Sequence, residues 1–173
     1  FAEAGYVDQD LQLPGSLNPT QMAQNRRQVQ PGSQNDFTDT RTKNFRFGIE
    51  QDLIGDWKFA AEGSNRTSHS NNFAACCGGG QQDREIYQVA PRVIGKFALP
   101  TGQAQLTFGL DGQKASWRAT YGLNNHQKQQ AVYTQLILPL AATVEATVGG
   151  RIAHVDNQAN AYGTPVNFND TQY

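Results

Sequence analysis

Three features of this chain predict an all-β fold, specifically an antiparallel segment of a transmembrane β-barrel with about six or seven strands. Apolar and polar residues alternate with period two, over segments longer than the five or six residues usual in soluble sheets. Short connections between these segments alternate with long ones, as short periplasmic turns alternate with long extracellular loops in such barrels. Aromatic residues gather near the segment ends, where interfacial girdles belong.

The composition excludes several other classes of protein. The 173 residues fall within the size range of one domain, and 14 Lys and Arg against 15 Asp and Glu leave a net charge of -1. Because no basic surplus can neutralise phosphates, nucleic acid is not an expected partner. Mean hydropathy is -0.61, and no uninterrupted apolar stretch of about 18 residues occurs, which argues against transmembrane helices. Together, 20 Gln, 13 Asn and 17 Gly outnumber the charged residues, a mix that suits β-structure with polar loops.

The first part of the chain is expected to hold the end of one strand and a long loop. Ala2, Ala4 and Tyr6 alternate with polar or small residues in the opening segment 1–10. The loop is expected to span residues 11–43. Within it, Asn18 as N-cap and Pro19 at the first helical position predict a short helix.

Three hairpins are then expected, each built from two strands around a short turn. The turns are expected near residues 52–56, 99–102 and 141–142. Longer loops are expected between the hairpins, over residues 68–83 and 123–129. The apolar side chains of every strand share one face, and in a barrel that face contacts lipid.

The opposite face carries charged residues at alternate positions, and in a barrel it borders a wet lumen. The residues predicted to face the lumen are Arg46, Glu50, Lys58, Glu62, Arg92, Lys96, Glu145 and Arg151. Candidates for ligand binding are cationic and aromatic residues assigned to loops, although exposed loop arginines are often simply solvated. These candidates are Arg26, Arg27, Arg41, Trp117 and Tyr121.

No residue pattern indicates catalysis or a bound metal, and no cofactor is expected. The chain has no nucleophile elbow and no Ser-His-Asp order. The histidines His69, His126 and His154 are isolated in different segments, which argues against an iron site. Cys76 and Cys77 are adjacent and lack zinc-site spacing, so they are expected to be two thiols or a local disulfide in a loop.

The ends of the chain suggest an internal fragment. The sequence starts at Phe1 without a signal peptide and stops in a polar run, residues 167–173. Thr171, Asn169 and Asn167 do not alternate with apolar residues as a terminal barrel strand requires, so Tyr173 is interpreted as a loop residue.

Several short motifs together resemble the barrel of a TonB-dependent outer-membrane receptor of the siderophore-receptor type. They resemble that family in their order and spacing over nearly the whole chain. The motifs are Leu-Pro-Gly-Ser-Leu-Asn-Pro-Thr-Gln at residues 13–21 with Asn25-Arg26-Arg27, the turn Gln51–Trp57, the Tyr-x-Gln segment 131–135 with Pro139-Leu140, and the Gly-x-Arg segment 147–151.

The resemblance implies that residues 1–173 are part of a larger barrel of twenty-two strands, without its plug domain and C-terminal strands. It also implies an outer-membrane location in a Gram-negative bacterium and no enzymatic activity. The implied function is TonB-coupled import of a scarce ligand, with a ferric siderophore as the expected one. TonB would act through a missing N-terminal region, and the implied full-length protein is a lipid-embedded monomer.

Two other interpretations remain open from the residues alone. One is a passive porin-like or adhesin-like barrel with an open channel. The other is a secreted soluble β-sandwich that binds carbohydrate on Trp57, Trp117 and Tyr121, with its apolar faces packed against a second sheet.

Overall fold

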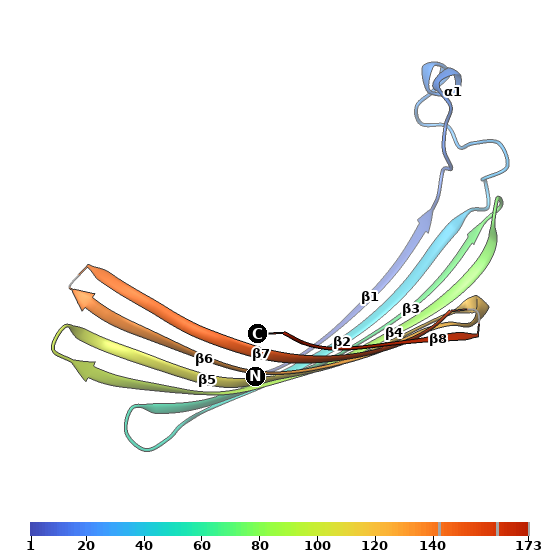
Figure 1. The fold of residues 1–173 in the computed structure, drawn as a ribbon. Coiled ribbons are helices and arrows are strands. Elements are labelled where there is room, and N and C mark those ends of the chain that lie inside the picture. Colours follow the sequence, from blue (N-terminus) through green and yellow to red (C-terminus); the bar gives the residue numbers. More distant parts are fainter. Residues whose placement is uncertain (142, 162, 173) are drawn as a thin grey trace.

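The computed structural model describes residues 1–141, 143–161 and 163–172, which form one antiparallel sheet of eight strands in sequence order (Figure 1). Every strand pairs with the strand that follows it in the sequence. The strands are β1 (Ala2–Gln12), β2 (Phe37–Asp52), β3 (Trp57–Ala74), β4 (Gly78–Leu99), β5 (Gly102–Ala119), β6 (Leu123–Ala141), β7 (Val144–Ala161) and β8 (Thr164–Gln172). Helical structure in the described residues is limited to α1 (Pro19–Gln24) and the 3-10 turn η1 (Thr120–Gly122).

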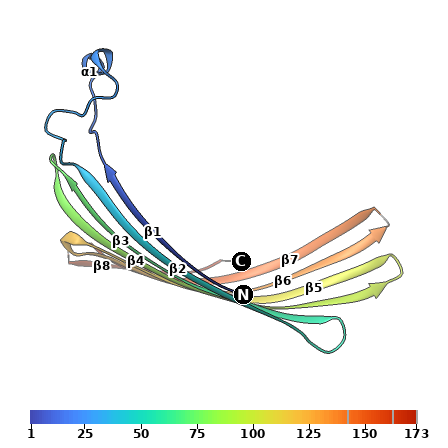
Figure 2. The ribbon, with the colours of Figure 1, turned by 180° about the vertical axis from the view of Figure 1, so that it is seen from behind.

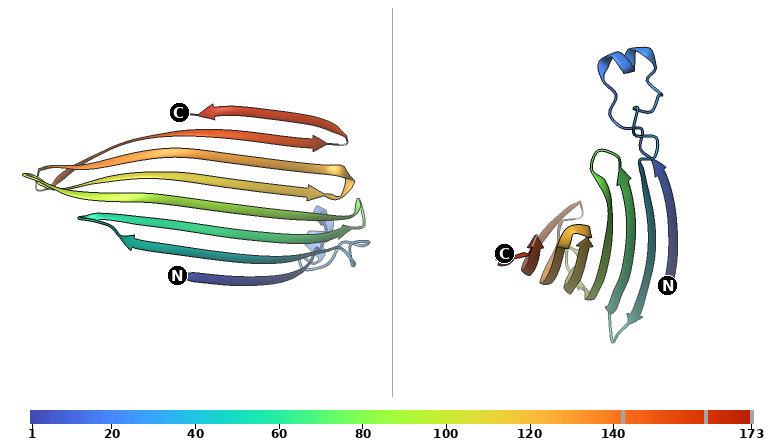
Figure 3. Two further views of the ribbon diagram at one scale, coloured as in Figure 1. Left: turned by 90° about the horizontal axis from the view of Figure 1, so that it is seen from below. Right: turned by 90° about the vertical axis from the view of Figure 1, so that its right-hand side faces the viewer.

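The sheet is a single twisted and curved layer. The strands bow along their length (Figure 1), and in the right-hand view of Figure 3 strands β1 to β4 run at an angle to the later strands. The described residues contribute no second sheet, and β1 and β8 form the two edges. No helix in the described ranges is long and apolar enough to cross a membrane.

The two ends of the sheet differ. The turn end holds the connections after β2, β4 and β6, and the loop end holds α1, η1 and the β3–β4 connection (Figures 1 and 2). The turn after β2 is tight, because Leu53 donates its backbone N–H to the carbonyl of Trp57 and Gly55 adopts a positive φ of 69°. The first two turns lie where the sequence predicts them, and of the third, predicted at residues 141–142, residue 142 lies outside the described residues.

The pairing register sorts the side chains onto two faces. One, which we call the band face, carries an apolar band between the turn end and the middle of the sheet. The band runs from Val132 to Leu140 on β6 and from Val144 to Ile152 on β7, about nine residues each, the length of a tilted bilayer span. Its members include Phe45, Phe47, Ile49, Trp57, Phe59, Val89, Val93, Phe97, Leu106, Phe108, Leu110, Leu136, Leu138 and Val148.

The opposite face, which we call the ionic face, carries the charged residues that alternate with the band. All eight residues predicted to face a lumen lie on it, because the register pairs Arg46 with Ser64, Glu50 with Ala60 and Glu145 with Pro139. The remaining five, Lys58, Glu62, Arg92, Lys96 and Arg151, follow from the same ladders.

Two segments predicted to be long loops are strands instead. β3 and β4 continue through residues 68–83 until only residues 75–77 separate them, and β6 begins at Leu123, within the expected 123–129 loop. These segments are polar on both faces, so period-two alternation disappears although the backbone ladder continues. The strands therefore project beyond the band at the loop end as paired hairpins. Of the three long loops expected, only the first is a true loop, and it covers residues 13–36.

The polar run near the end of the sequence is also a strand, which brings the described strands to eight rather than six or seven. β8 pairs with β7 from Ala161 and Thr164 to Ala153 and Gln172. Val166 and Phe168 of β8 lie on the ionic face, and Asn167 and Asn169 lie on the band face. The sequence test for a terminal strand required apolar residues at positions 167, 169 and 171, so the faces are the reverse of those it tested. Tyr173 lies outside the described residues.

The predicted loop helix is confirmed as α1, with Pro19 in its first turn. Asn18 accepts a hydrogen bond from the backbone N–H of Gln21 at 2.9 Å, and the side chain of Gln21 accepts one from the N–H of Asn18 at 2.9 Å. Asn18 and Pro19 are local signals, which is why the sequence alone predicts the helix, whereas the reciprocal capping box with Gln21 was not predicted. Cys76 and Cys77 form a disulfide in the β3–β4 connection.

Asp36 anchors the α1 loop to that same connection. It is 6% exposed, and its Oδ1 accepts the backbone N–H of Ala75 at 2.8 Å. Asp36→Ala removes the acceptor for the N–H of the exposed residue Ala75, and the loss of this hydrogen bond costs about 0.5–1.5 kcal/mol. We expect amide hydrogen exchange at Ala75 to accelerate about fivefold, while amides of the band strands keep their rates. Unchanged exchange at Ala75 would contradict this role.

Candidate ligand-binding face

Near the turn end, the ionic face carries pairs of opposite charge across neighbouring strands. Glu62 lies between Arg92, 3.1 Å from one carboxylate oxygen, and Arg46, 3.7 Å from the other. Lys58 is 3.3 Å from Glu50, and Arg151 is 3.3 Å from Asp111. The side chains are 30–64% exposed, so each pair contributes little to stability. Their effect is to balance most of the charge on this part of the face.

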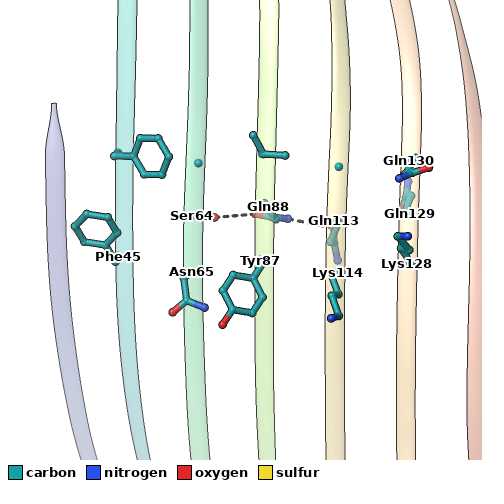
Figure 4. A pocket seen from close by; sticks show the side chains of 14 residues that line it. Phe45, Ser64, Asn65, Tyr87, Gln88, Gln113, Lys114, Lys128, Gln129 and Gln130 are labelled. Carbon is teal, nitrogen blue, oxygen red and sulfur yellow. Dashed lines mark hydrogen bonds between the residues drawn. The ribbon is translucent and has the colours of Figure 1, made fainter.

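A layer of neutral hydrogen-bonding groups follows toward the loop end. Ser64 donates to Gln88 at 3.3 Å, and Gln88 donates to Gln113 at 3.1 Å, which links three strands in one line (Figure 4). Hydroxyl pairs extend the layer on β2 and β3, with Thr42 and Ser68 3.1 Å apart. Such a surface can exchange hydrogen bonds with a hydrophilic ligand.

Beyond Ser64 and Gln88, and level with the Thr42–Ser68 pair, the charges on the ionic face of the described residues are Arg66 and Arg84, with Trp117 beside them. Register places Arg84 directly opposite Trp117, and Arg66 opposite Ile86, the next residue on the ionic face of β4 after Arg84. Trp117 is held by a hydrogen bond from its Nε1 to Gln82 Oε1 at 3.2 Å. Neither arginine has an ion-pair partner among the described residues. We call Arg66, Arg84 and Trp117 the arginine patch.

The arginine patch is suited to an anionic ligand. Guanidinium groups bind carboxylates and other oxyanions through two parallel hydrogen bonds, and an indole ring offers a flat apolar surface for stacking. The absence of acidic partners leaves both positive charges available. By contrast, Arg46 and Arg92 nearer the turn end already share the carboxylate of Glu62.

The five residues proposed from the sequence for ligand binding do not converge. Arg26 and Arg27 follow α1 in the loop, and Arg41 is a strand residue on the band face, where it contacts Asp8 and Asp39. Trp117 is also a strand residue, and it alone among the five is in the arginine patch. Tyr121 belongs to turn η1, but its side chain lies outside the described part of the structure.

Sequence reasoning missed Arg66 and Arg84 as candidates. They flank the segment 68–83, which was interpreted as a long loop, and neither belongs to a motif. They are candidates because they lack an acidic neighbour on the adjacent strands, and those neighbours are known only from the pairing register. The described residues contain no cluster of three or more His, Cys, Asp or Glu side chains suited to a metal ion. His69 contacts Asp83 at 2.7 Å on the band face.

Comparison with solved structures gives the fold an external reference. The match to the ferric citrate transporter FecA in its unliganded form covers 98% of this chain and 29% of the FecA chain, with 16% identity and a TM-score of 0.75. The match to the ferripyoverdine receptor of Pseudomonas aeruginosa covers 99% of this chain and 29% of the receptor chain, with 12% identity and a TM-score of 0.68. The match to the alcaligin outer-membrane receptor FauA of Bordetella pertussis covers 79% of this chain and 25% of the FauA chain, with 14% identity and a TM-score of 0.69.

The chain has the fold of a barrel sector of the TonB-dependent outer-membrane receptors. This sector spans between 25% and 29% of the length of those three structures. No family model matches the sequence, and no curated protein matches it. The identities of 12–16% explain why the likeness is visible in the structure rather than in sequence comparison.

The fold of the sector argues against a soluble sandwich. It is a single sheet with one apolar face, and among the described residues of that face Ile49 is 56% exposed, Val148 64% and Ile152 54%. Large apolar side chains exposed in a continuous band indicate a lipid contact. The ionic face with its arginine patch lies on the opposite side of the sheet from this band.

Proposed function

We propose that this chain is part of the wall of an outer-membrane receptor that binds and imports a ferric siderophore or a similar iron chelate, with energy supplied through TonB. The observation that carries the proposal is the combination of an exposed apolar band on one face with an ionic interior on the other, in a sheet that superposes on receptors of this kind. The wall contributes binding and enclosure, and no bond of the ligand is broken.

The arginine patch narrows the proposed ligand to an anionic chelate. It lies toward the loop end of the ionic face, beyond the balanced charge pairs, where a ligand entering from the loop side arrives first. Ferric complexes of carboxylates and catecholates carry net negative charge, whereas ferric complexes of three hydroxamates are neutral. Two arginines without acidic partners favour the first group.

The location of the two ends follows from the same proposal. In outer-membrane barrels the short turns are periplasmic and the longer connections are extracellular. The turn end of this sheet is therefore assigned to the periplasm, and the α1 loop and projecting hairpins to the outside. Ligand capture is assigned to the loop end, with the plug of the full-length receptor closing the lumen below.

The experiment measures uptake of radioactive iron by cells that produce the full-length protein containing this chain. Iron is supplied as its citrate, tricatecholate or trihydroxamate complex. We expect uptake of citrate or tricatecholate complexes at least tenfold above that of cells lacking the protein, and no comparable gain for the neutral complex. Deleting TonB from the same cells is expected to abolish the gain.

Each outcome separates the proposal from its alternatives. Uptake that persists without TonB would indicate a passive porin-like channel. Saturable, TonB-dependent uptake of the neutral complex alone would keep the receptor function and overturn the anionic ligand. No gain with any of the three complexes would overturn import of iron chelates.

A further inference from the structure

A hollow lies on the band face, outside the proposed interior. Its volume is about 510 Å³, and its floor is the backbone of β4 to β6 around Gly112, which has no side chain, while the ring of Phe47 covers Gly63. Phe45, Phe47 and Val89 form apolar walls on one side. Lys114 and Lys128 border it on the other, as seen on neighbouring strands in Figure 4.

The hollow lies at the polar border of the apolar band on the loop-end side. Tyr87 marks this border, because it donates its hydroxyl hydrogen to Glu85 at 2.6 Å, away from the band. On β1, Tyr6 makes the same kind of hydrogen bond to Asp8 at 3.0 Å. Tyrosines with the ring in the apolar region and the hydroxyl in the polar region are typical of a membrane interface.

The two lysines are arranged unfavourably for the protein alone. Lys114 and Lys128 are directly opposite each other on β5 and β6, and like charges in that position repel. Neither has an ion-pair partner among the described residues, although Asp156 is opposite Lys128 in the register. An anion placed between them would remove the repulsion.

One residue that lines the hollow has an amide with no partner. The Nδ2 atom of Asn65 is buried and makes no hydrogen bond within the described structure, and Asn65 lines the hollow beside Tyr87 (Figure 4). A buried amide N–H without an acceptor is unfavourable, but this atom is closed off from the hollow, so the site rests on the apolar walls and the two lysines.

We propose that this hollow binds a phosphorylated, acylated lipid of the outer leaflet, with an acyl chain against Phe45, Phe47 and Val89 and phosphate between Lys114 and Lys128. The proposal rests on the membrane location proposed above. We assign the hollow to a lipid rather than to a soluble anion, because its walls are apolar and it lies at the border of the apolar band. A bound lipid of this kind would fix the height of the barrel in the membrane.

The test measures lipid binding to the purified full-length protein by native mass spectrometry, with lipid A as the probe because it carries both acyl chains and phosphates. Phosphatidylcholine, whose headgroup has no net charge, serves as the comparison lipid. Lys114→Gln with Lys128→Gln is expected to weaken lipid A binding about 30-fold, since each basic residue near a membrane surface contributes about a fivefold preference for anionic lipid. Gly112→Leu fills the hollow and is expected to weaken binding of the same lipid with both lysines intact.

Lys43→Gln with Arg118→Gln is the matched control. Both residues are on the band face toward the loop end, are without ion-pair partners among the described residues, and do not line the hollow. This variant is expected to bind lipid A within about twofold of wild type. Circular dichroism of the sheet checks that each variant folds, and the lysine variant decides the question if Gly112→Leu does not fold.

Three results would overturn the lipid site. They are equal affinity of the wild type for lipid A and phosphatidylcholine, an undiminished affinity in the lysine variant, and an equal loss in the control variant, which would mean a diffuse basic surface. Because iron uptake is not measured, a failure here leaves the proposed transport function standing. Failure of the uptake experiment likewise leaves lipid binding measurable.

Discussion

Replacing Phe108 with arginine is expected to lower the free energy of unfolding of the full-length protein in lipid vesicles by about 2–4 kcal/mol. Phe108 is on β5 in the middle of the apolar band, opposite Val93 on β4 and Thr134 on β6. Its side chain is 49% exposed, so in a membrane it contacts lipid rather than protein. An arginine there carries its charge to the hydrocarbon midplane, where hydration is lost.

The neighbouring residue supplies the matched control. Thr107 is one position away on the same strand but on the ionic face, opposite Ile94 and Gln135. Thr107→Arg adds the same side chain on a water-lined surface and is expected to change stability by about 0.5 kcal/mol or less. Urea titration of both variants in vesicles measures the difference. Equal losses would mean that both faces meet the same medium, and the membrane assignment would be wrong.

The band strands are predictable from the sequence because alternate residues of a strand lie on the same face, and their polarity indicates the surroundings of that face. Phe45, Phe47 and Ile49 lie on the band face, while Arg46 and Glu50 lie on the ionic face, so under the proposed membrane location two different media impose period two on the sequence. The turn at Gly55 is equally local. Where both faces are wet, as at His69, Asn71 and Gln82, the constraint disappears and strand residues have the composition of a loop. The same reason explains why β8 was missed.

Contacts between strands were beyond sequence reasoning because they depend on register. Trp57 covers Gly95 on the next strand, where an added Cβ would lie 2.6 Å from the indole ring, so only glycine leaves room for it. Phe47 covers Gly63 in the same way. These aromatic-over-glycine pairs join residues far apart in sequence, and no local pattern identifies them. The start of α1, by contrast, depends on the adjacent residues Asn18 and Pro19, and it was predicted for that reason.

The residues of the candidate site also divide into those that alternation along one strand predicts and those that depend on the register between strands. The eight charged residues assigned to one face all share it, because strand alternation alone decides the face. The arginine patch was only partly found, through Trp117, because what distinguishes Arg66 and Arg84 from Arg46 and Arg92 is the lack of an acidic neighbour across the ladder. A carboxylate such as Glu62 neutralises its neighbours only when register brings it within reach.

Reversing the charge of both arginines in the patch is expected to weaken binding of ferric citrate to the full-length receptor about 100-fold. The variant is Arg66→Glu with Arg84→Glu. Loss of two charged hydrogen bonds, at about 1.5 kcal/mol each, accounts for a change of this size. The carboxylates would in addition repel the anionic chelate. Equilibrium binding to the purified protein measures the effect without requiring transport.

The control variant is Lys43→Glu with Arg118→Glu, which changes the net charge by the same amount on the opposite face of the same strands or their neighbours. Arg118 follows Trp117 directly in the sequence, so the two variants differ in face rather than in height. The control is expected to bind ferric citrate within about threefold of wild type, because water and salt screen charges across the sheet. An equal loss in both variants would mean that net charge, and not the patch, attracts the ligand.

Salt dependence gives an independent check on the same patch. If Arg66 and Arg84 contact the chelate directly, raising the ionic strength from about 0.05 to 0.5 M screens that attraction and weakens wild-type binding. In the uncharged variant Arg66→Gln with Arg84→Gln, the remaining affinity is expected to vary much less with salt. A wild-type affinity that is insensitive to salt would place the chelate on the neutral amide and hydroxyl layer around Gln88, where recognition rests on hydrogen bonds alone.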